Sequence, residues 1–130
     1  MPLILGDQVE TLCDANYVNN PALKTWNGGL EILVYPAGTS QFTLFDGTAI
    51  QSEQMAGSVS MTITSASPRP MLLRILAPRP AAVELDGTAV PEIDSTSAFD
   101  AASEGWQFDA ALGFVLVKFQ QAIGTTTITL

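Results

Sequence analysis

The segment Ser58–Thr64, SVSMTIT, decides the fold class, because its polar and apolar residues alternate strictly. Val59, Met61 and Ile63 fall on one face of an extended chain, and the serines and threonines between them fall on the other. A period of two is typical of a strand that buries one face. Valine, isoleucine and threonine also favour a pleated sheet over a helix. The segment therefore predicts a strand at the surface of a packed β-sheet.

Similar signals extend outward from this segment in both directions. Alternating, β-branched or aromatic segments predict further strands at Pro2–Leu5, Leu30–Tyr35, Gln41–Phe45, Gly105–Asp109 and Thr125–Leu130. Two short apolar runs, Met71–Leu76 and Phe114–Phe119, predict strands that are buried on both faces. Helix signals are nearly absent, and a single helical turn is expected near Ala22–Thr25.

Turn signals separate the predicted strands at regular intervals. They occur at Pro36-Ala37-Gly38, Asp46-Gly47, Ser67-Pro68, Asp86-Gly87 and Ala111-Leu112-Gly113. An Asp-Gly pair favours a hairpin because glycine adopts the positive φ that the turn requires. The Pro-Arg-Pro triplets at Pro68–Pro70 and Pro78–Pro80 are expected at strand ends or outside the sheet, since proline cannot donate to a ladder. Together these signals predict an all-β fold, an antiparallel β-sandwich of about 8–10 short strands, either immunoglobulin-like or jelly-roll-like.

Length and composition predict one domain over residues 1–130, with the sandwich core in residues 30–130. Residues 1–29 are expected to form a short strand followed by a long surface loop over Asp14–Gly29. A long connection without regular structure is uncommon in a compact domain and calls for a function or a partner.

The net charge of −8 arises from thirteen acidic residues against five basic ones. An acidic surface repels phosphate backbones and anionic lipids, so neither nucleic acid nor a membrane is expected as a partner. No basic region followed by an apolar stretch opens the sequence, so no signal peptide is visible and a cytoplasmic location is slightly favoured.

The sequence offers no residue set for catalysis. It contains no histidine, which rules out a Ser-His-Asp triad, a Cys-His pair and a histidine-based zinc site. Cys13 is the only cysteine, so no disulfide forms within the chain, and no base is available to activate this thiol. No catalytic residue is therefore assigned, and no cofactor is expected apart from a candidate calcium site.

The calcium candidates lie in the acidic region between Glu92 and Asp109. Calcium takes six to eight oxygen ligands, and carboxylates on loops supply them. The candidate ligands are Asp94, Asp100, Glu104 and Asp109. They lack the order of an EF-hand loop, and the alternative is that they are solvated loop charges.

Aromatic and amide side chains in the early loop are candidates for carbohydrate binding. Sugar rings have apolar faces, so an exposed aromatic ring with polar groups beside it is a suitable platform. The candidates are Trp26, Tyr17, Asn20 and Asn27, together with Trp106. In the alternative interpretation Trp26 pins the loop onto the sandwich, and Trp106 lies in the core or at a domain interface.

The stretch Leu30–Thr48, LEILVYPAGTSQFTLFDGT, resembles the C-terminal β-sandwich region of glycoside hydrolase family 31, the α-glucosidase and α-xylosidase group. Tyr35-Pro36, Gly38 and Phe42–Gly47 match in order and spacing a strand ending in Tyr-Pro, a glycine turn and a Phe-Thr-Leu strand before an acidic turn. The weaker similarities lie at Pro2–Leu5, Val83–Gly87, Gly105–Asp109 and Phe114–Lys118. The double aspartate of the family's turn is reduced to Asp46 here.

The resemblance implies an accessory domain without the catalytic barrel, whose two acidic residues lie outside this sequence. Residues 1–29 would then pack on the missing barrel. The leading hypothesis is a non-catalytic module of a carbohydrate-active enzyme that stabilises the enzyme and binds an oligo- or polysaccharide weakly. The second is a purely structural domain that packs against a catalytic barrel or forms a homodimer. The third, an independent enzyme, finds no support in the residues.

Overall fold

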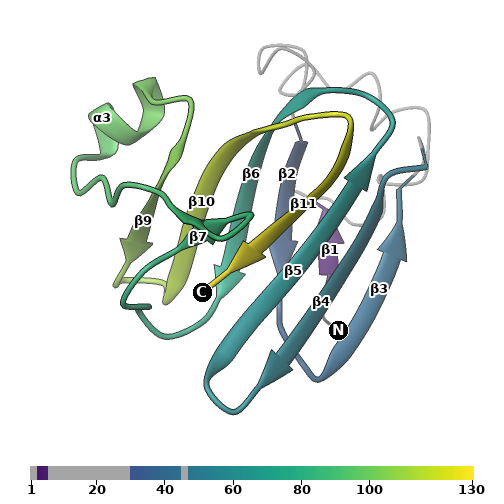
Figure 1. Ribbon diagram of the computed structural model, residues 1–130. Helices are drawn as coiled ribbons and strands as arrows, with labels where there is room; N and C mark the ends of the chain where they lie inside the picture. Colours follow the sequence, from purple (N-terminus) through teal and green to yellow (C-terminus); the bar gives the residue numbers. More distant parts are fainter. Residues whose placement is uncertain (1–2, 6–29, 45–46) are drawn as a thin grey trace.

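The computed structural model describes residues 3–5, 30–44 and 47–130, and the statements below concern these residues. Two β-sheets face each other across one hydrophobic core (Figure 1). The all-β sandwich that the sequence predicts is therefore confirmed. In the described part of the chain no helix is long and apolar enough to span a membrane.

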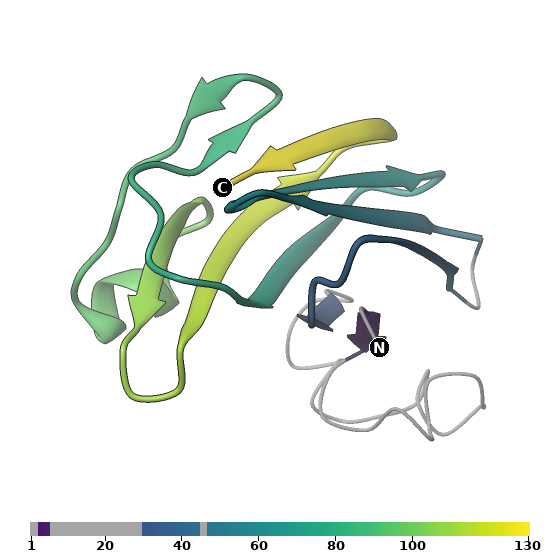
Figure 2. The same ribbon diagram turned by 90° about the horizontal axis from the view of Figure 1, so that it is seen from below.

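One sheet has five strands and the other has six. In spatial order, the five-stranded sheet contains β1 (Leu3–Leu5), β2 (Leu30–Val34), β6 (Arg69–Leu76), β10 (Phe114–Gln121) and β9 (Gly105–Asp109). The six-stranded sheet contains β3 (Thr39–Thr43), β4 (Ala49–Met55), β5 (Ser58–Ser65), β11 (Gly124–Thr129), β7 (Glu84–Leu85) and β8 (Thr88–Ala89). Figure 2 shows the two layers from below.

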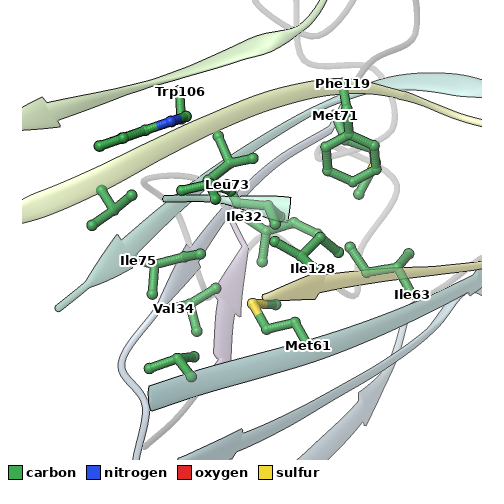
Figure 3. Close-up of a cluster of buried hydrophobic side chains, with 14 of the residues drawn as sticks. Ile32, Val34, Met61, Ile63, Met71, Leu73, Ile75, Trp106, Phe119 and Ile128 are labelled. Atoms are coloured by element: carbon green, nitrogen blue, oxygen red, sulfur yellow. The ribbon is translucent and has the colours of Figure 1, made fainter. Parts of the chain in front are cut away.

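The core forms where the alternating residues of both sheets meet. Val59, Met61 and Ile63 of β5 are all buried, as the alternation in this segment predicts. Facing them from the other sheet are the buried side chains of Ile32, Val34, Met71, Leu73, Ile75, Val115, Val117 and Phe119. Figure 3 shows side chains from both sheets converging in this layer. Alternation in Thr125–Leu130 places Thr126, Ile128 and Leu130 on the core side; Thr126 and Ile128 are buried, and Leu130 is partly buried against the core.

One strand pair is parallel, namely β2 with β6, while the other pairs between strands are antiparallel. Hairpin neighbours must run antiparallel because the chain reverses between them. β2 and β6 are not hairpin neighbours: between them the chain forms β3, β4 and β5 in the opposite sheet. It then returns to the five-stranded sheet in its original direction.

The Asp86-Gly87 turn joins β7 to β8 as predicted, and both residues have positive φ, 51° and 79°. This is the pattern of a type I′ turn, which suits the twist of a hairpin. A second turn of this kind, Ala56-Gly57, joins β4 to β5 with φ of 26° and 86°. The sequence signals do not predict it, because alanine is not a residue that favours positive φ.

Two features differ from the sequence expectations. β6 and β10 were expected to be buried on both faces, but only the inward face is buried, and most outward residues are half-buried. In the described part of the chain the short helix α3 (Thr96–Ala101) is the one element that reaches that side, through hydrogen bonds from Lys118 of β10. The second difference is α3 itself, which forms in the acidic region expected to be loop. The Ser95 hydroxyl accepts a hydrogen bond from the Ala98 amide at 3.3 Å, an N-cap, and only Phe99 is buried, so no helical periodicity was visible.

The prolines lie where the sequence predicts. Pro70 is the second residue of β6, whereas Pro68, Pro78 and Pro80 lie outside the strands.

Candidate functional site

The outer surface of the six-stranded sheet is a polar face built by β3, β4, β5 and β11. On these strands the residues between the buried positions point away from the core. We call the set Gln41, Thr43, Gln51, Thr62 and Thr64 the hydroxyl–amide face. Serine, threonine and glutamine both donate and accept hydrogen bonds, so this face can bond to ligands of either kind.

The register of the strands aligns these side chains in rows. Gln41 pairs with Gln51, and Gln51 pairs with Thr62, which places three polar groups side by side. In the next row Thr43 pairs with Ala49, and Ala49 pairs with Thr64. A hollow of about 420 Å³ lies over both rows and is also lined by Phe42 and Ile50. None of the described residues that line it is charged.

The outer surface of the five-stranded sheet has the opposite character. Its outward residues on β2, β6 and β10 include Leu33, Leu72, Leu76, Phe114 and Leu116, which we call the apolar face. Leu76 is 44% exposed, and the other four are half-buried.

Polar and aromatic neighbours frame the apolar face. An ion pair between Arg74 and Glu31 joins β6 to β2 on this side of the sheet. At the end of the face the rings of Tyr35 and Phe114 meet edge to face, with centroids 6.1 Å apart and an interplanar angle of 72°. This contact holds the Phe114 ring in place beside the exposed Leu76, its partner in the strand register.

A hollow of about 510 Å³ lies where α3 approaches the apolar face. Leu72, Leu116 and Phe99 supply its apolar lining, and Arg74 and Gln107 supply polar groups. Three of the four calcium candidates, Asp94, Asp100 and Asp109, also line it, whereas Glu104 does not.

These acids do not form a metal-binding group. Within residues 3–5, 30–44 and 47–130, no three acidic, histidine or cysteine side chains are arranged to hold a metal ion. The Asp109 carboxylate accepts hydrogen bonds from the amides of Ala111 and Leu112 at 3.0 and 3.2 Å, so it stabilises the β9–β10 turn. Calcium binding stays a prediction from the sequence, and no described geometry supports it.

Trp106, on β9, is 3% exposed and belongs to the core cluster. The Arg79 guanidinium lies over its ring, 5.7 Å from the ring centroid, and donates to the Glu92 carboxylate. The ring is therefore covered on the side that faces Arg79. This position corresponds to the core alternative for Trp106 and does not offer an open platform to a sugar.

The other predicted carbohydrate-binding residues, Trp26, Tyr17, Asn20 and Asn27, lie outside the described residues. The same holds for Cys13, for Asp46 and for the helical turn expected near Ala22–Thr25.

The hydroxyl–amide face was not among the candidate sites expected from the sequence. The alternation in Ser58–Thr64 showed that the polar residues of one strand point to water. Which polar residues of other strands lie beside them depends on the pairing of β3 with β4 and of β4 with β5. The available signal was weak: Gln41 and Thr43 alternate with apolar residues in one predicted strand, and Gln51 follows a turn signal further along the chain.

No protein-family model matches the chain, and no curated protein matches it. Solved structures do. The cycloalternan-forming enzyme from Listeria monocytogenes, in complex with pentasaccharide substrate, superposes with a TM-score of 0.72 and 24% identity. That match covers 78% of this chain and 10% of the enzyme. An uncharacterized protein from Listeria monocytogenes gives a TM-score of 0.70 with 25% identity over 78% of this chain and 10% of the other.

A GH31 dextranase from Flavobacterium johnsoniae, complexed with glucose, gives a TM-score of 0.65 and 18% identity. That match covers 78% of this chain and 16% of the dextranase. At such identities the similarity shows a shared fold. The chain spans only 10–16% of the length of the proteins it matches. Its β-sandwich is thus similar to a small part of much longer glycoside hydrolases.

Proposed function

We propose that this chain is a non-catalytic accessory β-sandwich module of a carbohydrate-active enzyme, which stabilises the enzyme and binds glycan weakly. The resemblance of Leu30–Thr48 to the C-terminal region of glycoside hydrolase family 31 supports the proposal. So does the structural similarity to 10–16% of a cycloalternan-forming enzyme and of a GH31 dextranase. A segment of that relative size suits an accessory domain.

The apolar face is the observation that carries the proposal. A sheet face that meets only water is normally polar. Here Leu33, Leu72, Leu76, Phe114 and Leu116 gather on the outer face of the five-stranded sheet, where α3 is the one element of the described chain that approaches them. Burying what remains exposed of them would contribute about 25 cal/mol for each Å² removed from water. An apolar centre with Asp94, Asp100 and Asp109 beside it has the composition of a contact surface with a polar rim.

The partner that we propose for the apolar face is a neighbouring catalytic domain. The matched enzymes extend far beyond the part that this chain resembles, so in them such a domain belongs to a longer chain.

The test of the apolar face uses the chain by itself. Without a partner, the face should bind a hydrophobic dye and drive weak association that increases with concentration. Leu116→Gln and Leu76→Gln should reduce both the dye fluorescence and the association seen in sedimentation. The matched control is Ile123→Gln, since Ile123 is 71% exposed but lies in the β10–β11 turn, away from the apolar face. A wild-type chain that stays monomeric at high concentration and binds no dye would contradict the proposal.

The alternative function is a structural domain that assembles with its own copies. The same apolar face favours it, because a homodimer would bury these five side chains between two copies of the chain. Sedimentation distinguishes the two. A dimer that persists at nanomolar concentration and separates in Leu116→Gln would support the assembly function over the accessory one.

Glycan binding is tested by affinity electrophoresis in gels that contain α-glucans, xyloglucan or β-glucans. Retarded migration of the wild type, lost in Trp26→Ala, would support the predicted role of the early aromatic segment. Unretarded migration in every gel would leave only the packing role.

A further inference from the structure

We propose that the hydroxyl–amide face is a binding surface for a neutral glycan chain, which occupies the hollow over β3, β4 and β5. The proposal rests on the proposed function, because it assumes that the module meets polysaccharide. It assigns the contact to Gln41, Gln51 and Thr62 rather than to the segment that contains Trp26.

The donors and acceptors of the face match those of a sugar. Each sugar hydroxyl can donate and accept a hydrogen bond, so its best partners are groups that do both. A glutamine amide supplies two donors and a carbonyl acceptor, and a threonine hydroxyl supplies one donor and two acceptor lone pairs. Gln41, Gln51 and Thr62 occupy paired positions on three adjacent strands. Adjacent strands lie about 4.8 Å apart, so one bound molecule can reach several of these groups.

These polar groups are also available to a ligand. Other polar side chains of this sheet bond to each other. On the hydroxyl–amide face itself the hydroxyls of Thr64 and Thr125 are 2.9 Å apart, and beside the core those of Ser40 and the buried Ser52 are 3.3 Å apart. Among the residues that the structure describes, the side chains of Gln41, Gln51 and Thr62 make no such bond. A ligand can therefore bond to them without breaking an internal contact.

The charge distribution favours a neutral ligand. The sequence contains thirteen acidic residues and has a net charge of −8. No acidic or basic residue is found among the described residues that line this hollow. An anionic ligand would be repelled by the protein and would find no cation here, and a cationic ligand would find no carboxylate partner. A neutral, hydroxyl-rich ligand matches this lining.

The shape of the hollow suits a small or extended ligand. Its volume of about 420 Å³ falls in the range of about 300–1,000 Å³ that is common for small-molecule sites. Ala49 and the methyl groups of the threonines offer apolar contacts to the C–H groups of a sugar ring. The described lining has no exposed aromatic platform, because Phe42 is half-buried and packs against the core. We therefore expect weak binding of an extended chain.

The position of the hollow is compatible with the packing role. The hydroxyl–amide face lies on the outside of the six-stranded sheet, and the apolar face lies on the outside of the five-stranded sheet. Figure 2 shows the two sheets as separate layers with the core between them. A catalytic domain on the apolar face would leave the hydroxyl–amide face open to polysaccharide.

The experiment is affinity electrophoresis of the chain in gels that contain dextran, soluble starch, xyloglucan or mixed-linkage β-glucan. A gel with polygalacturonate, an anionic polysaccharide, tests the preference for a neutral ligand. The variants are Gln51→Ala and Thr62→Val. The matched control is Gln120→Ala, because Gln120 is exposed on β10 in the other sheet. Urea unfolding of each variant verifies that it folds with wild-type stability.

The proposal expects wild-type retardation in at least one neutral gel and none in polygalacturonate. Gln51→Ala and Thr62→Val should each weaken that binding about tenfold, which corresponds to the loss of one or two hydrogen bonds. Gln120→Ala should migrate like the wild type.

Three results would overturn the proposal. They are equal retardation of the wild type and both variants, loss of retardation in Trp26→Ala alone, and no retardation in any neutral gel. None of these results bears on the proposed packing of the apolar face against a catalytic domain. The dye-binding and sedimentation measurements on Leu116→Gln test that role separately.

Discussion

Arg79 covers the indole of Trp106, with its guanidinium carbon 5.7 Å from the ring centroid, and at the same time pairs with Glu92. The arginine comes from the Pro78–Pro80 triplet after β6, and the tryptophan comes from β9. The contact therefore fastens the loop after β6 to the edge strand of the five-stranded sheet. The Pro78–Pro80 segment therefore has a structural role, since its central residue contacts both Trp106 and Glu92 of the same chain.

Trp106→Ala should lower the free energy of unfolding by about 3–5 kcal/mol, because it empties a large buried position. Arg79→Ala should cost about 0.5–1 kcal/mol, the usual value for a cation–π contact near the surface. Urea unfolding followed by fluorescence or circular dichroism measures both. Leu112→Ala, at an exposed turn position, serves as the control and should change stability by less than about 0.5 kcal/mol. An equally small effect of Trp106→Ala would show that the indole is not packed in the core.

Gly105→Ala should destabilise the start of β9. Gly105 has a φ of 149°, and a Cβ there would come within 2.6 Å of Ile93 Cδ1 and 3.1 Å of the Pro91 carbonyl oxygen. We expect a loss of about 1–3 kcal/mol from strain and overpacking. Gly124→Ala is the matched control, because Gly124 also has positive φ, 108°, but a Cβ there meets nothing within 4 Å. Equal losses in the two variants would show that backbone strain alone matters.

Ala56→Asn should stabilise the β4–β5 hairpin. Ala56 adopts a φ of 26° before Gly57, and Asn-Gly is a preferred pair for this type of turn. Relief of the left-handed alanine should raise stability by about 0.5–1 kcal/mol, or a few degrees in the thermal midpoint. Ala37→Asn is the control in a turn where the alanine does not have positive φ, and it should give no gain. A thermal midpoint that falls in Ala56→Asn would contradict the turn assignment.

Gln121→Leu should weaken the connection between β10 and β11. The Gln121 side chain is 1% exposed, and its amide nitrogen donates to the carbonyls of Ala122 at 2.9 Å and Gly124 at 3.1 Å. Removing the donor leaves these carbonyls without that partner, which should cost about 1–3 kcal/mol. Gln120→Leu, at the adjacent exposed position, is the control. The result would go against the assignment if both variants unfolded at the same urea concentration as the wild type.

Lys118→Met should loosen α3. The Lys118 ammonium donates to the carbonyls of Phe99 at 3.0 Å and Asp100 at 2.7 Å, near the C-terminal end of the helix. A cation satisfies those carbonyls and interacts favourably with the helix dipole. Hydrogen exchange of the Phe99 and Ala102 amides should become several-fold faster, while the amides of β5 exchange as before. Unchanged exchange in α3 would mean that burial of Phe99 alone holds the helix.

The sequence by itself determined the strands whose periodicity is local. Val59, Met61 and Ile63 had to share a face because successive residues of a strand point in opposite directions. The hairpin at Asp86-Gly87 was also decided locally, since the two residues fit the turn that the strands require. The absence of histidine limits the chemistry of the chain by composition alone, because histidine is the side chain that most often transfers protons in catalysis.

Only the tertiary structure decided which strands are neighbours. The parallel pairing of β2 with β6 depends on an excursion through three strands of the other sheet, which no local pattern encodes. The same holds for the row of Gln41, Gln51 and Thr62, which comes from the register of β3, β4 and β5. The apolar runs of β6 and β10 predicted burial on both faces, yet most residues of the outer face are half-buried and only α3 approaches it in the described chain. The sequence pattern of a strand indicates how apolar each of its faces is. Which strands and layers lie beside that strand is set by long-range packing.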